Sequence, residues 1–240
     1  MIDLVTIVPT RSRPEAVERV VEAWQATGAF DDGAELLFVV DRDDPRCDDY
    51  RAALITCRPG VSAAYADVWR PLVPKLNRIA VALAVGRSAM HIGFAGDDHL
   101  PRTKGWAGRY LATLYSQITG IVYCDDGYQG QNIPTQWAMS ADIVRALGRM
   151  VPAPVDHLYC DNAVRDLGLG AGCLTYLDDV LIEHMHPVAG KAPDDPQYQR
   201  VNSREQYRSD RPAYRGWARG GGLADDVAIV RALIDQGVPA

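Results

Sequence analysis

Apolar residues gather in short runs along the first half of the chain, and each run stops at glycine, proline or charged residues. Short runs with branched and aromatic side chains are typical of buried strands. Between them, apolar residues recur every three or four positions, the spacing of helices that bury one face. The predicted strands are residues 2–9, 36–40, 61–66, 90–95 and 120–124, and the predicted helices are residues 15–27, 74–85 and 104–117.

The pattern becomes less regular beyond residue 130. Short strands are predicted at 135–139, 173–177 and 180–183, the last two separated by Asp178 and Asp179, and helices at 141–147, 156–167 and 224–236. The alternation of strands and helices favours one α/β domain with a mostly parallel central sheet. We expect this domain to cover residues 1–190. Residues 191–240, rich in proline, glycine and arginine, are expected to form an irregular extension with a flap and a terminal helix.

Composition narrows the classes of protein that this chain can be. With 240 residues and a formal charge of −6, it lacks the general basic character that adhesion to nucleic acid or acidic membrane requires. No apolar stretch approaches the roughly 20 residues of a membrane span, and the first residues lack the basic start of a secretion signal. Five scattered cysteines indicate reduced thiols. We therefore expect a cytoplasmic protein without a membrane span.

Acidic residues follow three of the predicted strands. Asp41 ends the second strand, Asp97 and Asp98 follow the run at 90–95, and Asp125 and Asp126 follow the run at 120–124. In a parallel sheet these strand ends share one edge, where α/β folds bind ligands. Carboxylate oxygens are suitable ligands for Mg²⁺ or Mn²⁺, and such an ion could hold a diphosphate. The alternative for an isolated acidic pair is a solvated turn.

Basic and amide side chains are expected at the same edge. Thr10 and Arg11 follow the first strand, and Lys75 and Asn77 begin the helix before residue 90, so they offer hydrogen-bond donors for a nucleotide. Glycine-rich phosphate loops are missing from the sequence. A phosphate ligand would therefore need a metal ion and side chains.

Four segments together resemble the successive signatures of GT-A glycosyltransferases, particularly family-2-like enzymes. They are Val8-Pro9-Thr10-Arg11-Ser12-Arg13-Pro14, Val39-Val40-Asp41, Lys75-Leu76-Asn77 and Phe94-Ala95-Gly96-Asp97-Asp98-His99-Leu100-Pro101. The resemblance covers roughly the first 190 residues. It implies a Rossmann-like GT-A domain with a nucleotide-binding half at about 1–101 and an acceptor half at about 102–190.

The resemblance also implies roles for particular residues. Pro9, Thr10, Arg11, Lys75 and Asn77 would contact a nucleotide-diphosphate sugar, the donor. Asp41 would lie near its base, Asp97 near its ribose, and Asp98 would be the metal-binding acid of the DXD motif. His99 stands where a third acid is common, which makes it an alternative ligand to Asp98.

Two later segments resemble further parts of the family pattern. Asp161 falls where inverting members carry the general base, although its position also suits a helix N-cap. A late histidine often completes the metal shell in these enzymes; we assign His186, with His184 as an alternative. Zinc bound by His157, Cys160, His184 and His186 is a rival interpretation, but these segments lack a compact zinc-finger spacing.

Six arginines recur every three or four residues between Arg200 and Arg219, with tyrosines and a tryptophan among them. Pro212 and Gly216 argue against a continuous helix here. Three interpretations remain open for this segment: a flap over the donor diphosphate, a dock for an anionic acceptor such as nucleic acid, or a solvated arm paired with the acidic body.

The sequence predicts a metal-dependent glycosyltransferase that uses Mn²⁺ or Mg²⁺ and a nucleotide-diphosphate sugar. The acceptor hydroxyl could belong to a protein, a glycan, a lipid-linked molecule or a nucleic acid. A non-catalytic nucleotide-sugar or glycan-binding module on the same fold is the first alternative. A sugar nucleotidyltransferase is the second, and the missing glycine-rich loop after Pro9 counts against it.

Overall fold

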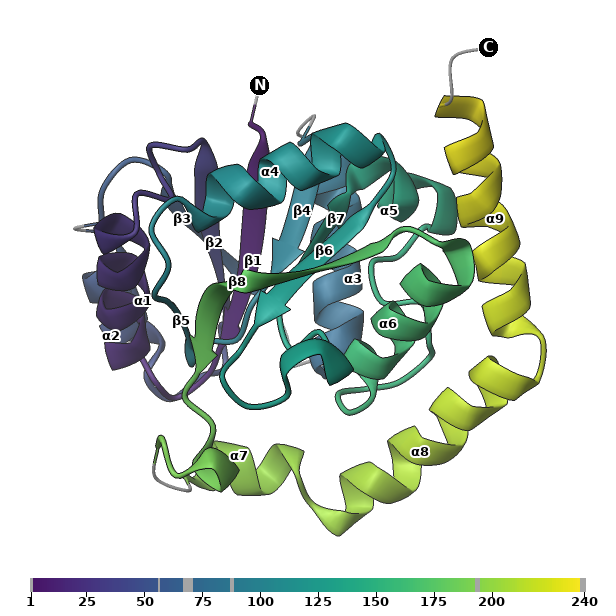
Figure 1. Cartoon of the computed structure of the whole chain (residues 1–240). Helices are drawn as coiled ribbons and strands as arrows, with labels where there is room; N and C mark the ends of the chain where they lie inside the picture. Colours follow the sequence, from purple (N-terminus) through teal and green to yellow (C-terminus); the bar gives the residue numbers. More distant parts are fainter. Residues whose placement is uncertain (1, 56, 67–70, 87–88, 193–194, 238–240) are drawn as a thin grey trace.

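The computed structural model describes residues 2–55, 57–66, 71–86, 89–192 and 195–237. Within them one sheet has the strand order β3-β2-β1-β4-β7-β6-β8-β5 (Figure 1). Six strands run parallel and only β5 and β7 run against them. The strands are β1 (Leu4–Thr10), β2 (Ala34–Asp41), β3 (Val61–Ala66), β4 (His91–Phe94), β5 (His99–Pro101), β6 (Ile121–Asp125), β7 (Trp137–Ser140) and β8 (Leu174–His184).

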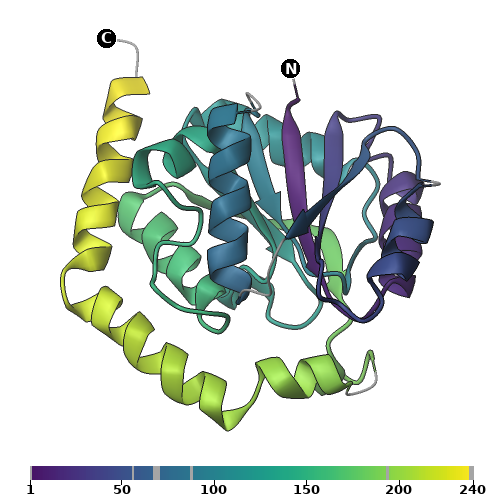
Figure 2. The same ribbon diagram turned by 180° about the vertical axis from the view of Figure 1, so that it is seen from behind.

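Helices cover both faces of the sheet, because strand residues alternate between the two faces. On β1, Leu4 and Val8 pack into one buried cluster with α1 (Glu15–Ala26), α2 (Cys47–Ile55) and α4 (Trp106–Gln117). Val5 and Ile7 pack into a second cluster on the opposite face, which α3 crosses in Figure 2. The helices of that face are α3 (Leu72–Gly86), α5 (Ala141–Leu147) and α6 (Cys160–Ala171). The predicted mostly parallel α/β domain is confirmed.

The C-terminal extension is mostly helical over its described residues from 196 to 237, so the predicted terminal helix is present and the irregular part before it was wrongly expected. It forms α7 (Pro196–Val201), α8 (Arg204–Arg219) and α9 (Gly222–Gly237), and α8 passes below the body of the domain to reach α9 (Figure 1). Pro212 lies inside α8 on its exposed side, where the carbonyl that loses its amide partner can bond to water. Trp217 on the opposite side is buried and donates to Asp226 of α9 (2.9 Å).

One other local prediction differs from the structure, and one helix was not predicted. The two short strands expected at 173–177 and 180–183 are one strand, β8, whose exposed Asp178 and Asp179 lie where its register with β6 shifts. Such an irregularity lets a strand continue past an unpaired segment. Helix α2 was not predicted, because only Cys47 and Tyr50 of its nine residues are buried and its apolar periodicity is weak. No helix among the described residues is long and apolar enough to cross a membrane.

Candidate active site

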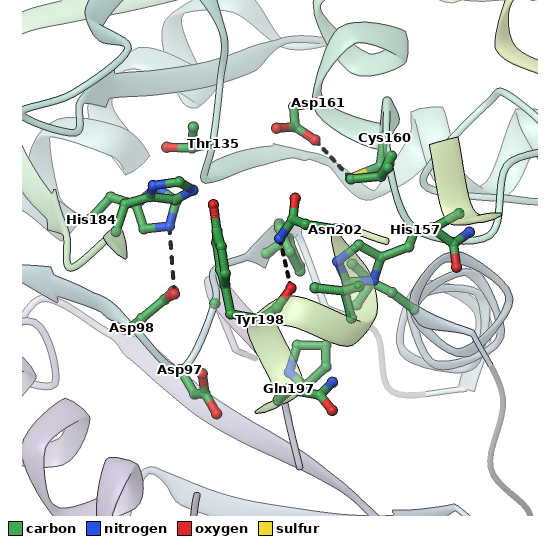
Figure 3. A pocket seen from close by; sticks show the side chains of 18 of the residues that line it. Asp97, Asp98, Thr135, His157, Cys160, Asp161, His184, Gln197, Tyr198 and Asn202 are labelled. Carbon is green, nitrogen blue, oxygen red and sulfur yellow. Dashed lines mark hydrogen bonds and ion pairs between the residues drawn. The ribbon is translucent and has the colours of Figure 1, made fainter. Parts of the chain in front are cut away.

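A cavity of about 580 Å³ opens at the edge of the sheet where the parallel strands end. Residues from the loops after β1, β2, β4 and β8 form one side. The segment before α6 lies across from them, and α7, the start of α8 and the loop after β6 complete the lining (Figure 3). The predicted residues that line this cavity are Pro9, Thr10, Arg11, Asp41, Lys75, Asp97, Asp98, His99, Asp161, His184 and His186.

Asp41 is fully buried and forms ion pairs with two positively charged side chains at the cavity wall. Its carboxylate lies 2.5 Å from Lys75 Nζ and 3.1 Å from Arg11 Nη1. Arg11 also reaches the exposed Asp43 (2.9 Å). A buried carboxylate requires such partners, since an isolated charge is costly in the protein interior. Arg11 and Lys75 are therefore fixed beside the cavity, where they can meet a negatively charged ligand.

Asp97 is bound by the loop after β1. Its carboxylate accepts hydrogen bonds from Thr10 Oγ1 (2.6 Å) and Arg13 Nη1 (3.0 Å). Burial, together with the charge of Asp98, raises the pKa of Asp97 to about 6, although Arg13 and Thr10 oppose the shift. Arg13 also donates two hydrogen bonds of 2.7 Å to Asp195, just before α7. This guanidinium therefore ties the C-terminal extension to the centre of the sheet edge.

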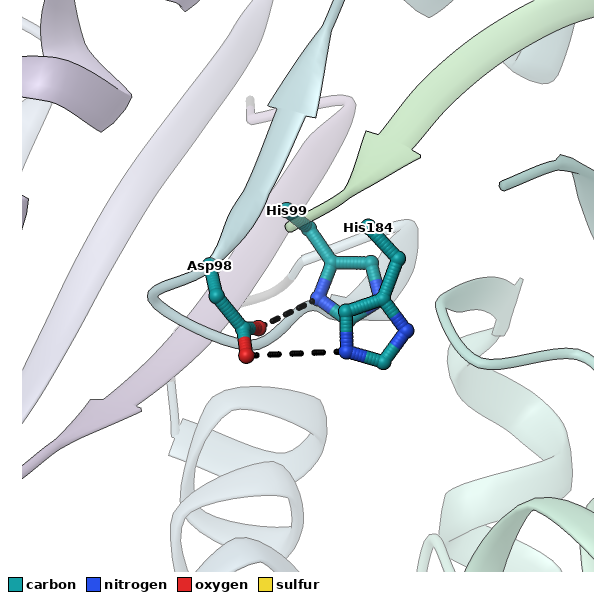
Figure 4. A group of neighbouring side chains, drawn as sticks. All are labelled: Asp98, His99 and His184. Carbon is teal, nitrogen blue, oxygen red and sulfur yellow. Dashed lines mark ion pairs between the residues drawn. The ribbon is translucent and has the colours of Figure 1, made fainter. Parts of the chain in front are cut away.

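Asp98, His99 and His184 form a group in which each side chain offers one ligand atom within 4.8 Å of the others (Figure 4). Asp98 Oδ1 lies 3.0 Å from His99 Nδ1, and Asp98 Oδ2 lies 3.5 Å from His184 Nε2. The two imidazoles stack with centroids 4.1 Å apart, because β5 and β8 pair antiparallel with His99 directly opposite His184. One carboxylate and two imidazoles can hold a divalent ion.

The charges of Asp98, His99 and His184 shift one another's pKa values. Burial alone would raise the pKa of Asp98, but hydrogen bonding and charge from His184 and His99 lower it well below its usual value. Burial would lower the pKa of His184, yet Asp126 and Asp98 raise it to about 9. His99, buried beside the charge of His184, has a lowered pKa. A metal ion would replace the proton that His184 carries at neutral pH, since ligation requires the neutral imidazole.

Asp126 supports this group from behind and does not line the cavity. Its Oδ2 lies 3.7 Å from His184 Nδ1, and its Oδ1 accepts the amides of Tyr128, Gln129 and Gly130. The expected convergence of strand-end acids is therefore direct for Asp41, Asp97 and Asp98. Asp125, the remaining acid, folds back onto its own turn and accepts the amide of Gly127 (2.9 Å).

His186, our first assignment for the late metal ligand, is not part of the group that His184 completes. Its ring stacks on Tyr128 at 4.9 Å and meets the edge of Tyr198 at 5.2 Å. The four residues of the rival zinc interpretation are not gathered either. Among the described residues, the candidate metal group contains neither Cys160 nor His157.

Asp161 faces the metal group across the cavity (Figure 3). Its Oδ1 accepts a hydrogen bond from Cys160 Sγ (2.8 Å). The N-cap of α6 is Tyr159, so the alternative role of Asp161 as the N-cap is excluded. The backbone of Tyr159 has φ +66°, a conformation that residues other than glycine seldom adopt. The stacking of its ring on Tyr214 of α8, with centroids 5.2 Å apart, supports this conformation.

Asn77 is not brought into the cavity lining. Its Oδ1 accepts the amides of Met150 (2.9 Å) and Val151 (2.7 Å), and its Nδ2 donates to the Val151 carbonyl. Asn77 therefore joins α3 to the loop after α5. Within the motif Lys75-Leu76-Asn77, Lys75 lines the cavity and Asn77 points away from it, as expected for positions two apart on a helix.

Comparison with family models and with curated proteins found no match to the sequence. Solved structures do match. The mannosyltransferase PcManGT from Pyrobaculum calidifontis, in complex with GDP-Man and Mn²⁺, aligns over 99% of this chain and 76% of its own, with TM-score 0.60 and 15% identity. TarS 1-349 of S. aureus, in complex with UDP-GlcNAc, aligns over 98% of this chain and 84% of its own, with TM-score 0.53 and 12% identity.

The chain has the GT-A fold. The fold that the sequence motifs predicted is thus confirmed, and the similarity extends through the C-terminal helices, since nearly the whole chain is aligned.

On this GT-A fold, the extension expected to supply a flap also supplies cavity residues that were not assigned individually from the sequence: Gln197, Tyr198, Asn202, Gln206 and Tyr207. A signal for this contribution was present. Asp195 followed by Pro196 is a typical helix start, and the Asp195 side chain does accept the amide of Tyr198 (2.7 Å). Recognising that start would have predicted α7, although not its place across the cavity.

Proposed function

We propose that this protein is a metal-dependent glycosyltransferase that moves a sugar from a nucleotide-diphosphate donor to an acceptor hydroxyl. One observation carries the proposal: a potential metal group of Asp98, His99 and His184 faces the carboxylate of Asp161 within one cavity. Arg11 and Lys75 supply positive charge on the side formed by the loops after β1 and β2, and Asp161 lies across the cavity. That arrangement suits a reaction in which a diphosphate leaves on one side and an acceptor loses a proton on the other.

The donor would lie against the loops after β1 and β2. Arg11 and Lys75 supply positive charge there, and Asp41 fixes both. Thr10 and Arg13 orient Asp97, which we assign to the ribose of the nucleotide. PcManGT and TarS, which share the fold, are complexed with GDP-Man and UDP-GlcNAc, and this supports a nucleotide sugar as the ligand class.

Asp98 and His184 are the proposed principal metal ligands, with His99 as the third. Two imidazole nitrogens beside one carboxylate favour Mn²⁺ over Mg²⁺, which prefers oxygen ligands. A divalent cation held there would offset the negative charge that builds on the leaving diphosphate. Asp126, whose Oδ2 lies 3.7 Å from the other ring nitrogen of His184, would act on this ligand through its charge.

Asp161 is the proposed general base. As the acceptor oxygen bonds to the anomeric carbon, the bond from that carbon to the diphosphate breaks, and the hydroxyl proton moves to the Asp161 carboxylate. The hydrogen bond from Cys160 Sγ holds Oδ1, while no described residue is bonded to Oδ2. This assignment predicts inversion at the anomeric carbon, because nucleophile and leaving group lie on opposite sides.

The test combines binding and turnover. The protein is incubated with a panel of nucleotide sugars and Mn²⁺, and both the melting temperature and the release of nucleotide diphosphate are measured. A transferase should be stabilised by its donor and should release nucleotide diphosphate. Stabilisation without release would favour a non-catalytic binding module and would overturn the proposal.

Asp98→Ala should abolish metal-dependent release without unfolding the protein, because it removes the oxygen ligand of the group. Asp48→Ala, at an exposed position on α2, is the matched control and should keep full activity. Undiminished turnover in Asp98→Ala would refute the metal assignment.

Asp161→Asn should keep donor stabilisation but lose transfer, since the amide cannot accept the proton. Product stereochemistry, read by NMR in the unmodified protein, provides a second measurement. A fully active Asp161→Asn variant would exclude Asp161 as the base.

A further inference from the structure

The outer side of α8 carries a line of five arginines: Arg204, Arg208, Arg211, Arg215 and Arg219. At about 100° per residue their positions fall within an arc of about 80°. All five are exposed, whereas Asp210 and Trp217, on the opposite side of the helix, are buried against the domain. We call these five residues the arginine stripe. It runs the length of α8, about 22 Å at 1.5 Å per residue.

The segment that contains the stripe is positively charged, whereas the rest of the chain is negatively charged. Residues 200–219 contain six arginines and two acids, a net charge of +4, and because the whole chain carries −6, the remaining residues carry −10. A cationic helix on an acidic protein would be expected to pair with its own surface. It does not: within the described parts of the chain, no hydrogen bond or ion pair engages any of the five guanidinium groups. The interpretation of a self-paired arm therefore does not hold for these five arginines.

We propose that the arginine stripe is a docking surface for a linear polymer that carries phosphate groups. Guanidinium groups bind phosphate with two parallel hydrogen bonds, which makes arginine better suited than lysine to this ligand. Neighbouring members of the stripe are three or four residues apart, about 4.5 to 6 Å along the axis, so a chain of phosphates can contact several of them at once.

The geometry favours a polymer over an anionic bilayer. A helix that binds a membrane surface buries an apolar face among the lipids. The apolar face of α8 is already buried against the domain, and Tyr207 is the one large hydrophobic side chain that the helix exposes within the described residues. A flat anionic surface would also cover more of a molecule whose remaining residues carry a net charge of −10. A narrow chain can follow the stripe and avoid that repulsion.

The stripe begins at the cavity. Asn202, Gln206 and Tyr207, around the N-terminal end of α8, line the candidate active site, as does Arg200 just before them. A polymer held along α8 can therefore place one end, or one repeat, at the cavity mouth. Its role as the acceptor rests on the proposed function, but docking itself does not, because it requires neither donor nor metal.

The experiment measures binding of a fluorescein-labelled single-stranded oligonucleotide of about 20 nucleotides by anisotropy, with inorganic polyphosphate as competitor. Single-stranded polyanions lose affinity with salt in proportion to the contacts made, so five contacts predict a log–log slope of about −3.5. The triple variant Arg208→Gln, Arg211→Gln, Arg215→Gln should retain a slope of about −1.4 and lose about tenfold or more in affinity at low salt.

The matched control removes three exposed arginines elsewhere, by Arg19→Gln, Arg51→Gln and Arg78→Gln. It should change affinity by less than about twofold, because net charge alone has a small effect compared with direct contacts. Equal weakening of both variants would overturn the proposal. So would binding to phosphatidylglycerol vesicles with no binding to oligonucleotide or polyphosphate. Donor-induced stabilisation should be unchanged in the triple variant; its absence from the unmodified protein would contradict the proposed function and leave docking intact.

Discussion

Replacing Asp210 by asparagine should disturb the side of the cavity formed before α6, the proposed acceptor side, and should spare the side where Arg11 and Lys75 lie. Asp210 is 1% exposed on α8, and its carboxylate accepts the amides of Asp156 (2.9 Å), His157 (3.0 Å) and Leu158 (2.7 Å). It also accepts Gln206 Nε2 (2.8 Å). These three amides belong to the segment that leads into α6, the helix that carries Asp161 in its first turn.

The magnitude follows from these four bonds. The carboxylate Oδ2 accepts three of them and Oδ1 accepts the amide of Asp156. In the best rotamer of asparagine, the side-chain NH₂ group replaces Oδ1 and faces the buried amide of Asp156. The side-chain oxygen keeps the other three hydrogen bonds, but it is no longer a charged acceptor. One orphaned amide costs about 1–3 kcal/mol, and three weakened bonds add a few tenths to 1 kcal/mol each, which gives about 3 kcal/mol. For a chain of this size, that lowers the melting temperature by about 6–12 °C.

The assay compares unfolding with two ligand readouts. Asp210→Asn should lose stability and slow transfer to the acceptor, while the increment in melting temperature caused by nucleotide sugar persists, since Arg11, Lys75 and Asp97 are untouched. Asp235→Asn, exposed on α9, is the control. The reasoning fails if Asp210→Asn is as stable as the control, or if it loses donor stabilisation in the same proportion as transfer.

Two further predictions concern the metal group. Gly96→Ala should abolish Mn²⁺ binding, because a Cβ at this position would overlap Asp98 Oδ1 and lie 2.8 Å from His99 Nδ1. Calorimetry measures the binding, and an unchanged Mn²⁺ affinity would contradict this prediction. In metal-free protein, His184 has a pKa raised from 6.5 to about 9, so its contribution to stability is complete below pH 6.5 and disappears as pH rises through about 9. The difference in urea unfolding free energy between wild type and His184→Gln should shrink across that interval, and a pH-independent difference would argue against the ion pairs with Asp98 and Asp126.

The sequence predicted most of the elements that deliver side chains to the cavity, because their patterns are local. The apolar runs before Thr10, Asp41 and Asp97 are almost uninterrupted, and a buried parallel strand requires just such runs. Strand direction then places their ends at one edge. For this part of the fold, periodicity and the parallel arrangement were sufficient.

What the sequence did not predict depends on contacts between distant segments. His184 and His186 are two residues apart, so strand periodicity gives them the same face and does not distinguish them. The choice is made by β5, three residues long, which pairs with β8 and sets His99 opposite His184. Pro212 led to the wrong prediction of a broken helix for a related reason. Proline is unfavourable inside a helix, but here its ring is exposed, and the buried side chains of Asp210 and Trp217 stabilise α8 against the domain.

The antiparallel pairing of β5 with β8 has a consequence for how this protein can vary. His99 and His184 are 85 positions apart, yet main-chain hydrogen bonds make them direct neighbours. Insertions in the loops between the two strands can therefore change length freely without moving the imidazoles. A slip of one residue in the ladder, by contrast, would turn His184 to the other face of the sheet. Relatives of this protein should thus differ widely in loop length while keeping the spacing from Asp98 to Pro101 constant.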